Sequence, residues 1–442
     1  MSTQLSGEKT AEARPLRLSD GAKAERPARW RWWLLWLLLA VLFTPSIRLP
    51  GGVPFRVEDV LVFGAGAILA ARYLLGLRTA KPGAIFYYTV AAVGTILMST
   101  LTAPAGLEVT AKEYLDCLRP VKFFLVYWVV RDCNPAISLP KFVRVMSIAA
   151  FALLGIACVE MFFARTMPES IVVRFFSGFT EKSPDLLLDM MATRPFATFN
   201  TPPDLGYVAC VCLFSGTLIQ SRWRRRIVVM TFFLILLVTA TRMLLFSLPL
   251  LMILQAFVRG KTAKEIFNLL RFNLALITLA GASSVVLLPL ISPHASEFTQ
   301  SMIVAVAKGD TGDEYSITTR LSNLYLVDYT WSNAPALGVG SRSLLPDFVD
   351  SELILTFHRY GLLGLATLLL IYPVGVGLAR QVAGVNRELY QFAVMALATT
   401  FLVGITLGAL DNSRTGVLLF VILGLVGATK DHQLRDTEFS KS

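Results

Sequence analysis

The sequence predicts an all-α polytopic membrane protein with about twelve transmembrane helices and one large loop on one side of the membrane. Of its 442 residues, 55% are hydrophobic and 16% are charged, and the mean hydropathy is +0.62. A soluble globular chain is much less apolar than this. The interval from about His294 to Asp350 is mostly polar and has no apolar run long enough to cross a bilayer, whereas such runs recur on both sides of it. Such a long polar insert is the natural place for a functional site.

The chain divides into five regions on this basis. Residues 1–30 are too hydrophilic and too long for the start of a signal peptide, so they predict a disordered cytoplasmic tail. We expect transmembrane helices one to nine in 31–292, a periplasmic loop in 293–350 and helices ten to twelve in 351–429. A second cytoplasmic tail is expected in 430–442.

Each predicted helix rests on one apolar run, and several runs are shorter than the roughly 20 residues that span a bilayer. The runs lie at roughly 32–47, 57–76, 84–103, 118–131, 142–163, 205–220, 227–240, 243–258, 272–291, 352–379, 389–409 and 414–429.

Basic residues cluster beside alternate connections between these runs. The clusters are Arg26, Arg29 and Arg31; Arg72, Arg78 and Lys81; Arg131, Lys141 and Arg144; Arg222, Arg224, Arg225 and Arg226; Arg259, Lys261, Lys264 and Arg271; and Arg380 and Arg387. Threading the chain with its N-terminus inside puts all of them on the cytoplasmic side. The positive-inside rule therefore accounts for the net charge of +11, and a nucleic-acid partner is not expected. Arginines on the opposite side need another explanation.

Two helix starts on that opposite side carry charged pairs. Glu58 and Asp59 open the second run, but neighbours in sequence do not share a helix face. Arg119 and Lys122, before the fourth run, are three residues apart and are predicted to share one. They are either snorkelling side chains at a helix end or part of an anion site.

Arginines also stand in two outward connections. Arg194 precedes the Pro-rich stretch that ends in Tyr207, where a fixed turn is expected, and it is the loop arginine nearest the next run. Arg242 lies in a connection so short that it must sit at the membrane surface. An arginine there is costly without an anionic partner or a water-filled cleft, which favours a functional role.

The polar insert itself predicts one amphipathic helix, over Ser316–Trp331, followed by a Pro/Gly turn over 333–342. Arg320 falls in the first turns of that helix. Arg342 follows two glycines, which would allow a bulky or phosphorylated ligand to approach the backbone closely.

Metal and disulfide chemistry are not indicated. The five cysteines lie in or beside apolar runs, and the three histidines have no Cys or carboxylate grouped at ligand spacing beside them. We expect no metal site and no cofactor.

Four landmarks follow one another in the chain: RPFATFNTPPDLG, then TATR in a tight outward connection, then TTRLSNLYLVDYTWSNAPALGVG, then DSELILTFHRYGLLG. Together they span Arg194 to Gly364. This ordered set, with one large outer loop before the tenth run, resembles the O-antigen ligase and O-antigen polymerase superfamily of bacterial polysaccharide assembly.

The resemblance implies a metal-independent, inverting membrane glycosyltransferase of the C-class type, in the bacterial inner membrane with its active site facing the periplasm. Its donor would be an undecaprenyl-diphosphate-linked glycan and its acceptor a lipid-linked glycan, with a flippase and a chain-length regulator as further partners. The family's outward arginines hold the diphosphate, a role that carries over to Arg242 and Arg320.

One departure from the ligase pattern concerns Asp350. In the ligases the last motif usually starts with a histidine. When the motif is aligned on Gly361, Asp350 is the residue at the position of that histidine. An acid here resembles a polymerase, with a ligase acting on lipid A core or protein as the alternative. Asp350 would act as a base or orient the acceptor hydroxyl, or it would cap the following helix. A transporter also fits twelve spans, but the two halves show no paired broken helices.

The candidate catalytic residues are therefore Asp350, Arg242 and Arg320. The candidate substrate-binding residues share a place at the outward side of the runs, and they are Arg194, Arg119, Lys122, Arg342, Glu352, His358 and Arg414.

The threading predicts that Gly384, between the tenth and eleventh runs, faces the cytoplasm. An alkaline phosphatase fused there should be inactive, because the enzyme folds only outside the cytoplasm, whereas a fusion in 293–350 should be active. Phosphatase activity from the Gly384 fusion would mean that the threading is inverted.

Overall fold

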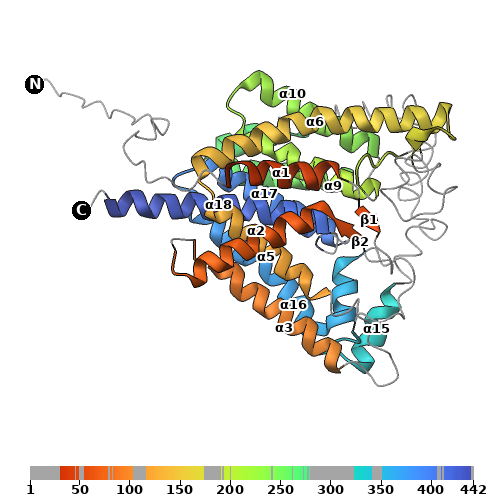
Figure 1. Cartoon of the computed structure of the whole chain (residues 1–442). Helices are drawn as coiled ribbons and strands as arrows, with labels where there is room; N and C mark the ends of the chain where they lie inside the picture. Colours follow the sequence, from red (N-terminus) through yellow and green to blue (C-terminus); the bar gives the residue numbers. More distant parts are fainter. Residues whose placement is uncertain are drawn as a thin grey trace, which may run out of the picture.

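The protein is described by a computed structural model, in which the regular secondary structure of the described residues is helical apart from one short hairpin (Figure 1). The structure describes residues 30–44, 46–48, 54–77, 80–81, 83–102, 116–173, 191, 194–199, 201–239, 242–260, 262–271, 273–275, 278, 323–340, 351–405, 410 and 413–439.

Eleven of the twelve predicted apolar runs coincide with helices, and the run at 272–291 is described only as far as residue 278. The helices are α1 (Trp30–Phe43), α2 (Val57–Leu74), α3 (Ala84–Thr102), α5 (Leu118–Asp132), α6 (Pro135–Thr166), α9 (Pro202–Phe214) with the 3-10 turn η1 (Ser215–Leu218), α10 (Arg222–Thr239), α11 (Arg242–Arg259), α15 (Leu324–Asn333), α16 (Glu352–Arg380), α17 (Arg387–Gly404) and α18 (Ser413–Phe439).

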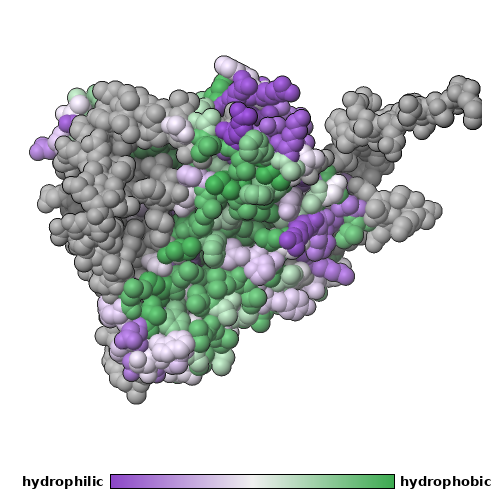
Figure 2. All heavy atoms as spheres, turned by 180° about the vertical axis from the view of Figure 1, so that it is seen from behind, coloured by the Kyte–Doolittle hydropathy of each residue, from purple (hydrophilic) through white to green (hydrophobic). Residues whose placement is uncertain are grey.

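Among these helices, α3, α6, α16 and residues Arg414–Leu434 of α18 are long and apolar enough to cross a membrane. Figure 2 shows hydrophobic side chains spread in a broad band over one face, with hydrophilic side chains at its borders. Large apolar residues such as Ile148, Phe151 and Leu370 are exposed. An apolar surface of this kind marks contact with lipid, so the chain has the character of an all-helical membrane protein.

Two predicted boundaries differ from the structure, and a third cannot be compared because its residues lie outside the described part. The amphipathic helix expected over Ser316–Trp331 is seen as α15, which ends at Asn333, and residues 316–322 lie outside the described part. Helix α18 continues through the expected C-terminal tail to Phe439, where an ion pair between Arg131 and Asp431 (2.9 Å) holds it to α5. The predicted N-terminal tail lies outside the described residues as far as residue 29.

A two-stranded hairpin was not anticipated from the sequence. Strand β1 (Ser46–Arg48) pairs antiparallel with β2 (Pro54–Arg56), so that Ile47 lies opposite Phe55. It connects α1 to α2 and lies at the same end of the bundle as α15 (Figure 1).

Charged contacts gather at the two ends of the bundle. At the end where α2, α5, α16 and α18 begin, called here the loop end, Lys122 pairs with Asp59. At the opposite end, called the basic end, Arg72 lies 3.7 Å from Asp132. Helix α18 runs between them, and every residue from Arg414 to Ala428 is buried. Charged side chains at the two ends of the bundle are expected for a membrane protein, because a charge in the apolar membrane interior is costly.

Helix α16 is broken near the loop end. Gly361 has φ +63 and ψ −160, which separates a first segment, 352–360, from the long remainder of the helix. A break frees backbone groups that cannot remain unpaired at the edge of a membrane. The turn after α15 pairs with them: His358 O accepts from Val339 N–H at 2.9 Å, and Leu362 N–H donates to Pro335 O at 2.8 Å.

The glycines of this turn approach the backbone of α16 instead of a ligand, which corrects the role expected for them. Gly338 has φ +70, and a Cβ atom added to it would lie 2.5 Å from the carbonyl carbon of Arg359. A Cβ at Gly361 would likewise lie 2.4 Å from the carbonyl carbon of Ala336. The two segments can dock only because both positions lack a side chain.

Gly338→Ala should therefore destabilise the protein by about 2 kcal/mol, because it combines a strained φ with a backbone clash. Thermal or SDS unfolding of the purified variant measures this. The matched control is Gly377→Ala in the same helix α16, where an added Cβ meets nothing within 4 Å and the change should be neutral or mildly stabilising. Equal stability of the two variants would contradict the docking.

Candidate functional site

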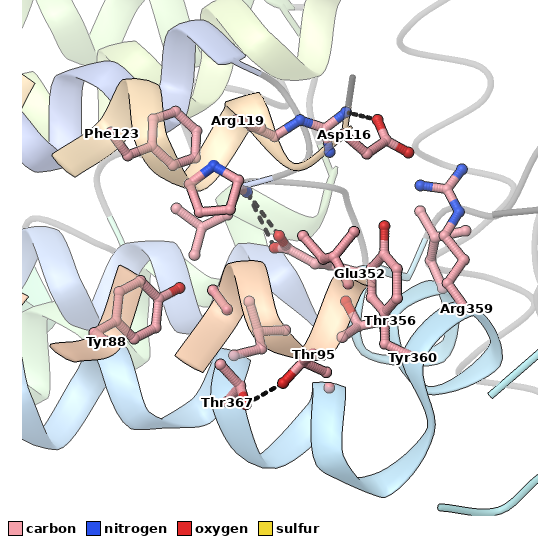
Figure 3. Close-up of a pocket in the computed structure, with 17 residues that line it drawn as sticks. Tyr88, Thr95, Asp116, Arg119, Phe123, Glu352, Thr356, Arg359, Tyr360 and Thr367 are labelled. Carbon is pink, nitrogen blue, oxygen red and sulfur yellow. Dashed lines mark hydrogen bonds and ion pairs between the residues drawn. The ribbon is translucent and has the colours of Figure 1, made fainter. Parts of the chain in front are cut away.

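A pocket opens at the loop end between α3, α5 and α16 (Figure 3). Its volume is about 690 Å³ including the space at its open mouth. It is lined by Tyr88, Ala92, Thr95, Ile96, Asp116, Arg119, Pro120, Phe123, Glu352, Leu355, Thr356, Arg359, Tyr360, Gly364, Thr367, Leu368 and Leu410.

The charged residues of the pocket come from two helix starts. Arg119, in the first turn of α5, contacts Asp116, with Nη2 3.3 Å from Oδ1. Arg359 extends from the first segment of α16 at the same side of the pocket (Figure 3). Two guanidinium groups and nearby carboxylates can bind an anion and orient hydroxyl groups.

Glu352 is the carboxylate that α16 places in the pocket. It is buried, and its two oxygens lie 2.9 and 3.1 Å from the backbone nitrogen of Leu410, which donates to them. Ser351 is the N-cap, and its hydroxyl accepts a hydrogen bond from Ile354 N–H at 3.4 Å. The capping role considered for Asp350 therefore belongs to Ser351.

The interior of the pocket is largely apolar. Ala92 and Ile96 of α3 face Leu368 of α16 across it, and the hydroxyls of Thr95 and Thr367 lie 3.3 Å apart. Since α3 and α16 are both candidate membrane spans, the pocket combines a charged part at the loop end with an apolar part along membrane helices. An amphiphilic molecule with an anionic group fits this distribution of polarity.

The first landmark forms a loop, 194–199, whose shape is held by a buried acid. Glu160 of α6 accepts hydrogen bonds from the backbone nitrogens of Phe196, at 3.2 Å, and Ala197, at 2.6 Å. Ala197 has φ +50, a conformation that an alanine keeps only when its surroundings impose it. Arg194 donates through Nε to Thr239 O at 3.1 Å, at the C-terminal end of α10. The first two landmarks therefore meet in space.

Arg414 is fully buried beside this loop and does not line the pocket. Its guanidinium donates to the carbonyl oxygens of Thr198 and Thr44, and its Nε lies 3.7 Å from Glu58 Oε1. The guanidinium carbon also lies 5.8 Å from the centre of the Phe199 ring. Arg414 thus joins α18 to the end of α1, the start of α2 and loop 194–199, and these contacts give it a positioning role.

Lys122 and His358 also lie outside the pocket lining. Lys122 is buried against Asp59, so it and Arg119 serve different partners although the sequence predicted a shared face. His358 is buried under α15, where its Nδ1 lies 2.8 Å from Thr330 Oγ1.

The remaining predicted site residues cannot be placed against the pocket. Asp350, Arg320 and Arg342 lie outside the described residues, and Arg242 begins α11 with its side chain outside the described part. Of the predicted residues, the structure brings Arg119 and Glu352 together in one pocket.

Sequence reasoning missed Asp116, Arg359 and Tyr360, which also line the pocket. Asp116 was detectable as the residue one helical turn before Arg119. Arg359 stands beside His358 in the last landmark, where a charged residue at the start of a membrane helix is a signal in itself.

No protein-family model matches this chain, and no curated protein matches it. The class is therefore defined by the fold and the site alone: a helical membrane protein with a charged, partly apolar pocket at one end of its bundle.

Arg414→Met should lower the free energy of unfolding by about 3–5 kcal/mol, because it removes a buried cation from the Glu58 carboxylate and leaves Arg56 Nη1 at 4.0 Å from Glu58 Oε1. Adding Glu58→Gln should restore part of the loss, since the buried charge is then removed as well. Unfolding titrations of both variants test this, with Arg380→Met, at an exposed site, as the neutral control. Equal stability of the single and double variants would refute the coupling.

Proposed function

We propose that the protein is a membrane glycosyltransferase that polymerises undecaprenyl-diphosphate-linked oligosaccharide repeats into a cell-surface polysaccharide. The observation that carries the proposal is the pocket, which places Arg119 and Arg359 at the loop end and continues as an apolar space along α3 and α16. The ordered landmarks in the sequence support the same assignment.

The proposed donor matches the pocket part by part. Its diphosphate is anionic and sits between a hydrophilic glycan and a long apolar chain. Arginine binds phosphate oxygens through a planar fork of donors and needs no metal to do so. The apolar walls formed by Ala92, Ile96 and Leu368 suit the first isoprene units.

The proposed reaction is a single displacement with inversion. The acceptor hydroxyl oxygen forms a bond to the anomeric carbon, the bond from that carbon to the diphosphate oxygen breaks, and the hydroxyl proton passes to a base. The arginines offset the charge that grows on the departing lipid diphosphate. Asp350 is the candidate base from the sequence, and Glu352 and Asp116 are the carboxylates among the residues that line the pocket.

In this proposal the chain crosses the inner membrane twelve times, and the pocket and the polar insert 293–350 face the periplasm. Support comes from the basic end of the bundle: α2, α5 and α16 each have an arginine in their last turn, at Arg72, Arg131 and Arg380. The positive-inside rule then puts the pocket, at the opposite end, on the periplasmic side.

The choice of a polymerase over a ligase follows from the acid at position 350, where the ligases usually have a histidine. The acceptor is therefore another lipid-linked repeat, and a flippase that delivers both substrates and a chain-length regulator are the partners that such an enzyme requires.

Arg359→Gln and Arg119→Gln should each lower polymer synthesis from lipid-linked repeats about 100-fold, the effect of removing one donor from a charge-stabilising site. Arg242→Lys should also lose most activity, since a point charge does not replace a planar fork. Reconstituted enzyme at equal protein level provides the measurement.

The matched control is Arg380→Gln, which changes an exposed arginine at the other end of the same helix as Arg359. Its activity should equal that of the unmodified protein. If the Arg359 and Arg119 variants also retain full activity, the pocket does not bind the diphosphate.

A further inference from the structure

Helix α15 carries an unusual number of exposed large side chains for a short helix outside the candidate spans. Leu324, Tyr325, Tyr329 and Trp331 are 51%, 52%, 41% and 60% exposed. Its buried residues include Thr330, which contacts α16. Exposed tyrosine and tryptophan side chains are apolar over most of their surface and polar at one atom, so they favour an environment that is partly apolar and partly wet.

The helix is held firmly in place. Thr330 Oγ1 lies 2.8 Å from His358 Nδ1, and the Trp331 ring lies 6.4 Å from the Phe357 ring. The turn that follows α15 is paired with the backbone on both sides of the break in α16. The exposed aromatic side chains therefore occupy a fixed position relative to the pocket.

Helical geometry places α15 on the side of α16 that is turned away from the pocket. With Glu352 at zero and about 100° per residue, Thr356 lies near 40° and Arg359 near 340°. All three line the pocket. Phe357, near 140°, and His358, near 240°, are the residues in contact with α15. The residues that contact α15 thus point in other directions than these three, and the pocket lining includes no residue of α15.

The surface next to α15 is the apolar face of the candidate spans. Leu362 and Leu363, directly after the break in α16, are exposed. In α3, Leu101 is 73% exposed, and it lies two residues beyond Ser99, whose hydroxyl donates to Arg359 O at 2.6 Å. The apolar band therefore reaches the level of the break. Figure 1 shows α15 at one corner of the molecule. In Figure 2, which shows the molecule from behind, the band of hydrophobic side chains extends towards the same corner.

We propose that α15 is an interfacial helix, and that its partner is the phospholipid bilayer at the boundary between headgroups and acyl chains. Trp and Tyr side chains concentrate at that depth in membrane proteins. Because α15 is fixed to the first segment of α16, it sets the depth at which Glu352 and Arg359 stand. The pocket then opens at the level of lipid phosphate groups, whatever its ligand is.

The test uses the full chain in nanodiscs and isolates Trp331 as the difference in fluorescence between the unmodified protein and Trp331→Phe. In phosphatidylcholine brominated near the headgroup end of its acyl chains, the Trp331 signal should fall by about half or more relative to unbrominated lipid. The control is the same difference for Trp128→Phe, because Trp128 is only 5% exposed and should change little.

A second tryptophan position gives an independent measurement in case the first one is affected by a folding defect. Leu324→Trp combined with Trp331→Phe puts the indole on the same flank, since seven residues advance a helix to within about 20° of the starting direction. It should be quenched by brominated lipid to the same extent as Trp331. The proposal is overturned if both reporters ignore brominated lipid and are quenched by aqueous acrylamide like free tryptophan. Protection of Trp331 by a soluble oligosaccharide, without quenching by brominated lipid, would assign the surface to glycan instead.

Discussion

The loop end depends on one buried guanidinium, that of Arg414. A charge in an apolar interior must be paired and hydrogen-bonded, or it destabilises the fold by several kcal/mol. Arg414 meets this requirement with the Thr44 and Thr198 carbonyls and the Glu58 carboxylate, and no hydrogen bond reaches that carboxylate among the described residues. Three parts of the chain that are far apart in the sequence, at 44–58, 198 and 414, are thereby held together. The same constraint makes loop 194–199 adopt one shape.

The connection between α17 and α18 carries this support to the pocket. Leu410 donates its backbone N–H to Glu352, and Arg414, four residues later, holds loop 194–199. Two nearby residues therefore support both the pocket and loop 194–199. The backbone N–H of Leu410 contacts the pocket residue Glu352, and the side chain of Arg414 contacts the loop. Glu352 and Arg414 keep their positions because each is held by hydrogen bonds to the backbone of another segment. Helix α15 adds a third attachment, from the other side of α16.

Local patterns predicted part of this site and misjudged the rest. Glu58 and Asp59 were expected to point in different directions, and they do, toward Arg414 and Lys122. Arg119 and Lys122 were predicted to share a helix face, but each lies near a different acid, Asp116 and Asp59. The glycines before Arg342 correctly signalled a close approach, yet what approaches Gly338 is the backbone of α16. Spacing along a helix predicts the direction in which a side chain points, but it does not predict which residue that side chain contacts.

By itself the sequence determined the membrane character and the position of eleven helices, because length and hydrophobicity are local properties and a bilayer selects on them directly. It also marked the charged helix starts as candidate site residues. Only the tertiary structure decided which of them share a pocket, since Arg119 and Glu352 come from segments more than two hundred residues apart. Arg414 and His358 are buried outside the pocket lining, where Arg414 contacts loop 194–199 and His358 contacts α15. That outcome depends on packing between distant segments, which no pattern within one segment records.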